Sequence, residues 1–204
     1  AMHETVRLGN LLKVCRSRNN FALTDIASHY RFIAGGIGIT PILSMIRWCE
    51  AHGKNWSLLY CSRSRPRTAF YEELRMFGDR VRFHFDDESL GQHADFELEL
   101  AEPRLDEHVY CCGPRPLMLA VEAAGMRRPE GSVHFEWFSA KEVAHAPPVP
   151  TDLFEIVLRS SGLRLQVTPE KSILETLEDN GVPIPFSCRE GLCRTCETPL
   201  CGGE

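Results

Sequence analysis

The stretch YRFIAGGIGITPILSMIRWCEAH, residues 30–52, contains a strand signal, a glycine-rich turn and a helix signal in immediate succession. Its first part, YRFIA, is a short apolar and aromatic run of the kind that forms a buried strand. After the glycines, apolar residues recur at the spacing of one buried helix face: Ile42, Leu43, Met45, Ile46 and Cys49. Pro41 fits the first turn of this helix, and Thr40 is a candidate N-cap. The stretch therefore predicts a buried strand joined to a helix by a tight turn.

The same alternation of strand-like and helix-like segments continues to residue 137. Runs typical of strands are WSLLY (56–60), VRFHF (81–85), HVYCC (108–112) and SVHFEW (132–137). Helical patterns lie between them, in TAFYEELRMF (68–77) and PRPLMLAVEAAG (114–125). This order predicts an α/β fold in which a parallel sheet of about five strands is covered by helices.

Gly35, Gly36 and Gly38 lie where the first strand ends and the helix begins. A dinucleotide pyrophosphate can bind at such a turn, because backbone N–H groups are free there and the helix dipole is positive. Glycine also lets the backbone approach the phosphates closely. The third glycine of the usual dinucleotide fingerprint is absent, since Pro41 takes its place. By itself the turn is equally consistent with a tight strand-to-helix connection.

Two other strand ends carry residues suited to the same ligand. The carboxyl ends of parallel strands share one edge of the sheet, where open α/β sheets bind ligands. At this edge, Cys112, Gly113 and Pro114 predict a second turn that leads into a helix. The second strand leads into CSRSRPR. In this segment, the side chains of Ser62, Arg63 and Arg65 could bind a ribose or a phosphate. For Arg67 in the same segment, a solvated loop position is the preferred interpretation.

The ends of the chain differ from this pattern. A proline-rich segment, EVAHAPPVPT (142–151), is typical of a stiff linker. After it, LFEIVLR (153–159) and LRLQVTP (163–169) predict a hairpin around a Ser-Gly turn, and SILETLEDNG (172–181) predicts a short amphipathic helix ending at Gly181. Before residue 29, VRLGNLLKVCRSRNNFAL (6–23) predicts one or two strands without a core of their own.

CREGLCRTC places three thiols, Cys188, Cys193 and Cys196, at the spacing C-x4-C-x2-C. Soft thiolates select zinc or iron–sulfur chemistry. Structural zinc sites usually contain paired C-x2-C hooks, whereas this longer first gap is the plant-type 2Fe-2S spacing. Gly191 relieves crowding where the loop would pass the sulfides. Cys201 is interpreted as structural, with a four-thiolate zinc site that includes it as the alternative.

Composition excludes several other classes of protein. The net charge of −5 argues against nucleic acid, which needs a basic stripe. There is no apolar run of about eighteen residues and no signal-peptide layout, so a cytoplasmic location without membrane insertion is expected. The nine cysteines should then be reduced thiols. Three single cysteines, interpreted as small buried side chains, are Cys15, Cys49 and Cys61.

AGGIGITP, YCSR, YCCGP, HFEWF and CREGLCRTC, in this order and at these distances, resemble the phthalate dioxygenase reductase family. The likeness covers essentially the whole chain. It implies a flavin-binding β-barrel, a nucleotide domain of the ferredoxin-NADP reductase type and a C-terminal β-grasp plant-type ferredoxin. Members of the family take a hydride from NADH onto FMN and pass electrons singly through a 2Fe-2S cluster to a Rieske-type terminal oxygenase.

The resemblance also implies roles for individual residues. The pyrophosphate and the nicotinamide side would be held by Gly35, Gly36, Ile37, Gly38, Ile39, Thr40 and Pro41. Ser62 and Arg63 would contact the adenosine ribose, and Cys112–Pro114 the edge of the nicotinamide, with Thr40 and Cys112 as the catalytic candidates. Phe138 would lie near the flavin. Three cluster ligands would be Cys188, Cys193 and Cys196.

The implied domains are the last part of the barrel (1–28), the NAD(P)H-binding domain (29–140), a linker (141–152) and the incomplete ferredoxin domain (153–204). The family's flavin-phosphate segments have no counterpart, and no fourth cluster cysteine follows at the plant-type distance. Both ends of the chain are therefore expected to be cut off.

Three alternatives stay open. A non-enzymatic nucleotide-binding or zinc-stabilised adaptor could have kept the sheet without flavin or cluster. A ferredoxin-like carrier could be fused to an inert domain. NADPH could replace NADH, because Arg63 and Arg65 could bind a 2′-phosphate.

Overall fold

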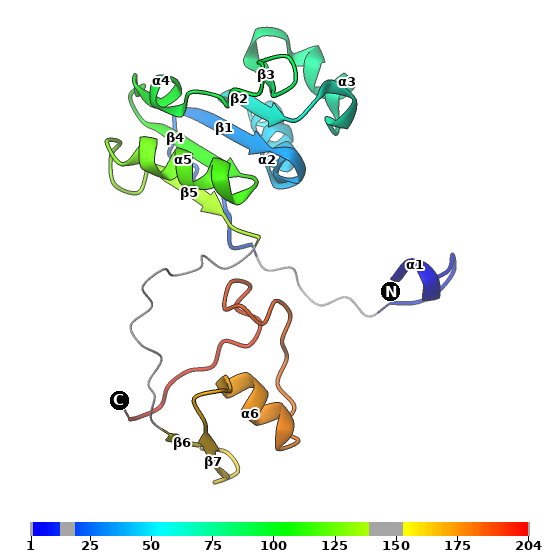
Figure 1. Ribbon diagram of the computed structural model, residues 1–204, viewed down its shortest axis with the longest axis vertical. Helices are drawn as coiled ribbons and strands as arrows, with labels where there is room; N and C mark the ends of the chain where they lie inside the picture. The colour runs from blue at the N-terminus through cyan, green and yellow to red at the C-terminus, as the bar shows by residue number, and fades with distance from the viewer. Residues whose placement is uncertain (1, 13–18, 139–152, 204) are drawn as a thin grey trace.

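A computed structural model describes residues 2–12, 19–138 and 153–203. Its larger part is a five-stranded sheet in the order β3-β2-β1-β4-β5, with every neighbouring pair parallel (Figure 1). The strands are β1 (His29–Gly35), β2 (Asn55–Ser62), β3 (Val81–Phe85), β4 (Glu107–Cys112) and β5 (Val133–Glu136). The predicted parallel sheet is confirmed.

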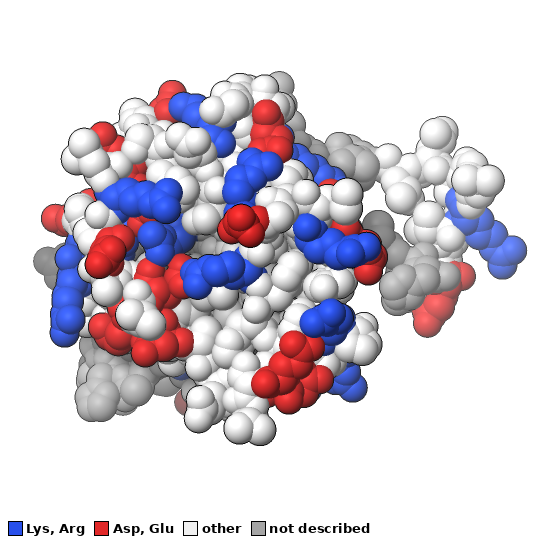
Figure 2. Space-filling model, turned by 90° about the horizontal axis from the view of Figure 1, so that it is seen from above, with Lys and Arg blue, Asp and Glu red and all other residues white. Residues whose placement is uncertain are grey.

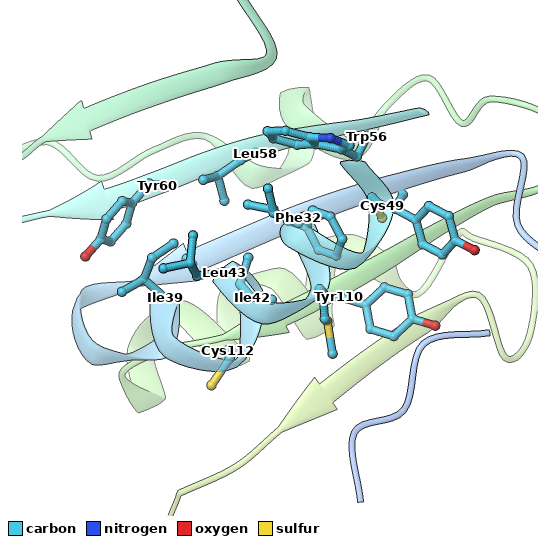
Figure 3. Close-up of a cluster of buried hydrophobic side chains, with 14 of the residues drawn as sticks. Phe32, Ile39, Ile42, Leu43, Cys49, Trp56, Leu58, Tyr60, Tyr110 and Cys112 are labelled. Atoms are coloured by element: carbon cyan, nitrogen blue, oxygen red, sulfur yellow. The ribbon is translucent and has the colours of Figure 1, made fainter. Parts of the chain in front are cut away.

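Helices cover both faces of this sheet. On one face, α2 (Ile39–Ala51) and the single turn α3 (Tyr71–Leu74) bury side chains against even-numbered residues of β1, such as Phe32. Figure 3 shows Ile39, Ile42 and Leu43 of α2 directed at the aromatic side chains of the strands. On the other face, α4 (Phe96–Leu100) and α5 (Arg115–Gly125) pack against a second core that contains Ile33. Strands buried on both sides explain why their sequences are continuously apolar.

Two local predictions for this domain need correction, and one short helix was missed. The N-cap of α2 is Gly38 rather than Thr40, whose hydroxyl instead donates to the Ile37 carbonyl at 2.9 Å. The helix predicted over 68–77 is reduced to α3 and a 3-10 segment (Arg75–Arg80), because Phe70 and Gly78 adopt positive φ angles of 59° and 60°. The helix α4 was not predicted, since its five residues are too few for a clear period.

The strands predicted before residue 29 are absent from the described residues 2–12 and 19–28. Residues Met2–Thr5 form a short helix, α1, and Leu8, Leu11 and Leu12 after it are exposed. A strand forms only where another segment pairs with it, and none of the described residues does so here. Phe21 packs into the core beside α2. Cys15 lies outside the described residues.

The C-terminal part contains the predicted hairpin and helix. β6 (Phe154–Val157) and β7 (Arg164–Val167) pair antiparallel, with Gly162 in the turn at φ +70°. Helix α6 (Ile173–Asp179) begins with a capping box, in which the Ser172 side chain accepts from the Glu175 N–H and the Glu175 carboxylate accepts from the Ser172 N–H. The helix ends two residues before Gly181. Among the described residues, no helix is long and apolar enough to cross a membrane.

A histidine pair joins β4 to β5. The Nδ1 of His108 and the Nε2 of His134 are 2.9 Å apart, and the His134 ring lies on the ring of Tyr110. Burial and the neighbouring His108 lower the pKa of His134, and burial also lowers the pKa of His29. Both imidazoles are therefore held neutral in the folded protein.

Acidification is expected to destabilise the protein through these two histidines. A pKa below the unfolded value of about 6.5 means that stability is fully present above that pH and falls as the pH drops toward the folded pKa. Urea unfolding at pH about 8 and about 5.5 tests this, and His134→Asn should reduce the loss. The control is His93→Asn, because the His93 side chain is 82% exposed. An equal loss in parent and His134→Asn proteins would contradict the assignment.

Candidate nucleotide and iron–sulfur sites

The register of the sheet brings the predicted nucleotide segments to one edge. Gly35 at the end of β1 pairs with Cys61, Ala34 pairs with Cys112, and Ser62 pairs with Phe85. The turns after β1, β2 and β4 are therefore neighbours, as the sequence predicted. This edge is the one at which open α/β sheets bind ligands.

Close packing of two turns explains most of the glycines. A Cβ on Gly38 would lie 2.0 Å from the carbonyl oxygen of Cys112, and one on Gly35 would lie 2.6 Å from Pro114 Cδ. A Cβ on Gly113 would lie 2.9 Å from the Gly35 nitrogen. Gly36, at φ +51°, has no atom within 4 Å of its Cβ position. Of these glycines, only Gly36 borders open space where a phosphate could approach.

The turn after β1 is held from inside. The Tyr60 hydroxyl donates to the Gly36 carbonyl at 3.0 Å, a contact that the sequence did not suggest. Ile37 projects outward with 66% of its surface exposed, whereas Ile39 is fully buried and its N–H already donates to the Gly36 and Ile37 carbonyls. A ligand could therefore reach the side chain of Ile37, whereas the side chain of Ile39 is covered by the protein.

Cys112 is buried at the end of β4. Burial, with the charge of Glu136 on the next strand, raises the pKa of its thiol to about 12. Burial also raises the pKa of Glu136. Cys112 is thus a protonated, uncharged group near neutral pH and is not suited to act as a base. It can shape the edge of the site without exchanging protons.

The other cysteines of the nucleotide domain are equally unreactive. Cys49 is fully buried, as predicted, and Cys61 is half-buried. Burial raises the pKa of Cys49 to about 11 and that of Cys61 to about 12. All of the described cysteines are free thiols.

The segment after β2 presents its predicted residues unequally. Ser62 is buried and its hydroxyl donates to the Ser64 carbonyl at 3.2 Å. Arg63 and Arg67 are exposed, while Arg65 is paired with Glu88 at 3.3 Å. On the face shown in Figure 2, acidic and basic side chains are interspersed, unlike the basic stripe of a nucleic-acid site.

The three-thiol loop has backbone N–H groups directed at sulfur. The Cys188 sulfur accepts from the N–H groups of Glu190 and Cys193, both at 3.4 Å, and the Cys193 sulfur accepts from the Cys188 N–H at 3.5 Å. Hydrogen bonds to the Cys193 sulfur, first from the Cys188 N–H and then from Thr195, lower the pKa of Cys193 to about 6. Positive φ angles at Arg189, Gly191 and Arg194 curve the backbone around the sulfurs. Such a loop suits thiolate ligands of a cluster.

The three thiols do not form a compact group of metal ligands in the described part of the chain. The described residues contain no group of three or more His, Cys, Asp or Glu side chains in metal-binding geometry. Cys201 is exposed, with its sulfur 3.9 Å from the Pro199 carbonyl, so burial does not support a structural role for it. The N–H groups that donate to the sulfurs therefore suit thiolate ligands, although the cysteine side chains do not surround a common centre.

Comparison with known proteins separates the chain into two matched regions. Residues 32–123 match the oxidoreductase NAD-binding domain family, and residues 156–204 match the 2Fe-2S iron-sulfur cluster binding domain family. Over 207 residues the chain is 40% identical to the phthalate 4,5-dioxygenase oxygenase reductase subunit of Pseudomonas putida, covering 100% of this chain and 63% of the relative. The chain belongs to the phthalate dioxygenase reductase-like family.

Two solved structures agree with that assignment. The phthalate dioxygenase reductase described as a modular structure for electron transfer from pyridine nucleotides to [2Fe-2S] matches with a TM-score of 0.65 and 38% identity, covering 92% of this chain and 58% of that chain. An intact type IV self-sufficient cytochrome P450 monooxygenase matches with a TM-score of 0.84 and 34% identity, covering 100% of this chain and 26% of that one. The chain thus spans less than two thirds of the reductase subunit's length.

In this member of the family, Arg189 anchors the thiol loop to α6. Its two terminal nitrogens donate to the Glu178 carboxylate at 2.9 and 2.8 Å, and its guanidinium lies 4.1 Å from the centre of the Phe186 ring. Next to a predicted ligand, Arg189 could tune a cluster, meet a partner's carboxylate or be a plain loop charge. Because Glu178 already engages it in a bidentate pair, a positioning role is favoured.

Several residues at the nucleotide edge and in the three-thiol loop carried no clear signal in the sequence. The Tyr60 hydroxyl donates to the Gly36 carbonyl, and the Thr195 hydroxyl accepts from the Cys193 thiol. A pocket of about 440 Å³ lies between α2, Glu136 and the segment around Phe21. Phe138, two residues beyond Glu136, is 53% exposed. Among these residues, Phe138 was predicted through the family resemblance, and Glu136 could have been noticed near the end of the predicted strand run 132–137.

Proposed function

We propose that this chain is the greater part of an oxygenase reductase, which carries electrons from NADH through FMN and a 2Fe-2S cluster to a Rieske-type terminal oxygenase. One observation carries the proposal. A single chain combines a glycine turn at the ligand-binding edge of a parallel sheet with a three-thiol loop whose N–H groups point at sulfur. The family assignment supports the same direction of electron flow, from a nicotinamide nucleotide to an iron–sulfur protein.

The residues of the sheet edge would bind and orient the dinucleotide. The open space at Gly36 suits the pyrophosphate, with Ile37, Thr40 and Pro41 on the nicotinamide side. Arg63 would approach the adenosine ribose. Gly113 and Pro114, packed against Gly35, would fix the position of the β4 turn. The neutral Cys112 thiol would border the nicotinamide and exclude water there.

FMN, when bound, supplies the conversion of a two-electron hydride into single electrons. Phe138 is exposed beside the same edge and is proposed to border the flavin.

In the C-terminal part, the proposed ligands of the 2Fe-2S cluster are Cys188, Cys193 and Cys196. We also retain the division into barrel end (1–28), nucleotide domain (29–140), linker (141–152) and ferredoxin domain (153–204) as a proposal. The linker lies outside the described residues.

Purified full-length protein provides the test. We expect flavin absorbance near 450 nm as general for this cofactor, iron and sulfide in equal amounts, and bleaching on anaerobic addition of NADH. Cys193→Ser should lose iron while flavin reduction by NADH persists. Protein with zinc or no metal, and without flavin, would favour the adaptor instead. A cluster without NADH oxidation would favour a ferredoxin-like carrier.

Thr195→Val is expected to lower the reduction potential of the iron–sulfur centre. The Thr195 hydroxyl lies 3.1 Å from the Cys193 sulfur, and a hydroxyl hydrogen bond to a thiolate ligand stabilises the reduced, more negative state. Anaerobic redox titration measures the shift. Thr198→Val is the matched control, because the Thr198 hydroxyl donates to the Cys196 carbonyl rather than to sulfur. An unchanged potential in Thr195→Val would remove this role.

A further inference from the structure

Acidic residues that follow β3 lie against the arginine segment that follows β2. The Asp86 N–H donates to the Ser62 carbonyl at 3.1 Å, and the Asp87 N–H donates to the Arg63 carbonyl at 3.2 Å. These backbone bonds extend the β2–β3 pairing past Ser62 and Phe85. They hold the loop 86–88 beside the position where the adenosine ribose would bind.

Arg65 is restrained in this arrangement by three neighbours. Its Nη2 is 3.3 Å from Glu88 Oε1, and both side chains are about half exposed, at 55% and 54%. Its guanidinium lies 5.4 Å from the ring centre of Phe85 and 5.5 Å from that of Tyr71. The charge that could attract a ribose phosphate is therefore already paired and stacked.

Arg63 differs from Arg65 in its surroundings. It is exposed, and within the described part of the chain it makes no ion pair. Arg63 is thus available to the phosphate groups of either nicotinamide dinucleotide. Arg65 differs because a carboxylate, that of Glu88, already engages it.

We propose that Glu88 makes this site favour NADH over NADPH, by holding Arg65 and by placing a carboxylate near the ribose 2′ position. A 2′-phosphate needs a free arginine, and a neighbouring carboxylate repels it. A 2′-hydroxyl is uncharged and meets no such repulsion. This inference rests on the proposed function, because it assumes that the adenosine half binds beside β2.

Binding of adenosine fragments to this chain tests the proposal without flavin or iron. Adenosine 2′,5′-bisphosphate carries the 2′-phosphate of NADPH, and 5′-AMP represents the same half of NADH. By calorimetric titration, Glu88→Gln should bind the bisphosphate about threefold more tightly than the parent does, with 5′-AMP unchanged. Adding Arg65→Gln should abolish the gain. Glu130→Gln removes an exposed carboxylate from the turn before β5, at the opposite edge, and should change neither affinity.

Two results would overturn the inference in different ways. If Glu88→Gln changes both fragments equally or neither, Glu88 does not discriminate, while the nucleotide site itself stands. If the parent chain binds neither fragment, the proposed dinucleotide site fails and the inference fails with it. In the holoenzyme, the ratio of kcat/KM for NADPH to that for NADH should rise by the same factor in Glu88→Gln.

Discussion

Replacement of Glu107 by alanine is expected to lower the free energy of unfolding by about 3–5 kcal/mol. Glu107 begins β4, and its side chain is fully buried. Its carboxylate accepts two hydrogen bonds from Arg31 at 3.1 Å and one from Arg128 at 2.7 Å. Alanine would leave two guanidinium groups in the interior without this anion.

Arg128 has little capacity to adapt to that loss. Its side chain is 2% exposed, and its Nε and Nη1 already lack hydrogen-bond partners among the described residues. Arg31 keeps a second carboxylate, because Glu99 accepts from it at 3.1 Å. The unpaired buried charge of Arg128 is therefore the main cost of the substitution.

Urea unfolding monitored by circular dichroism measures the effect. Glu73→Ala is the matched control, because Glu73 pairs with Arg47 at 2.8 Å on the surface, with side chains 41% and 61% exposed. Removal of that pair should cost at most about 1 kcal/mol. If Glu107→Ala does not fold, Glu107→Gln should fold with an intermediate loss, since an amide still accepts hydrogen bonds. Equal, small losses in the Glu107 and Glu73 variants would contradict the prediction.

Gly38→Ala should separate two turns at the nucleotide edge. The added methyl group would lie 2.0 Å from the Cys112 carbonyl oxygen and 2.4 Å from its carbon, so the backbone has to move. Forced repacking of this kind costs about 3 kcal/mol. The movement also displaces the turn that borders Gly36. We expect a less stable protein that no longer binds 5′-AMP or NADH.

Gly125→Ala adds the same methyl group at the end of α5 and provides the comparison. There the nearest atom is a Val133 methyl at 3.4 Å, which is close to ordinary contact. Alanine is also favoured over glycine in a helix by about 1 kcal/mol. Thermal unfolding and titration with NADH should therefore show little change in this variant. Similar stability in the Gly38 and Gly125 variants would show that the turns are not in close contact.

Local sequence patterns were sufficient to predict the features whose interacting residues are close together along the chain. The alternation of apolar strands with helical periods predicted the parallel sheet, and Ser172 and Glu175 alone provide the capping box that starts α6. The spacing of Cys188, Cys193 and Cys196 likewise needs no tertiary information. These features can be read from the sequence because the residues that interact are close together along the chain.

Only the tertiary structure decided what each residue of the site can do. Register across the sheet places Cys112 against Gly38, so this glycine serves packing, while Gly36 faces open space. The same register places Glu88 beside Arg65, twenty-three positions away in the sequence. Burial, which no local pattern measures, removes Ile39 from ligand contact and keeps the Cys112 thiol protonated. The sequence by itself therefore determined the five strands of the parallel sheet and the helices α2, α5 and α6, but not α4 or the shortened helix α3. The contacts between strand ends decided which side chains are free to bind, because those contacts join residues that are distant in the chain.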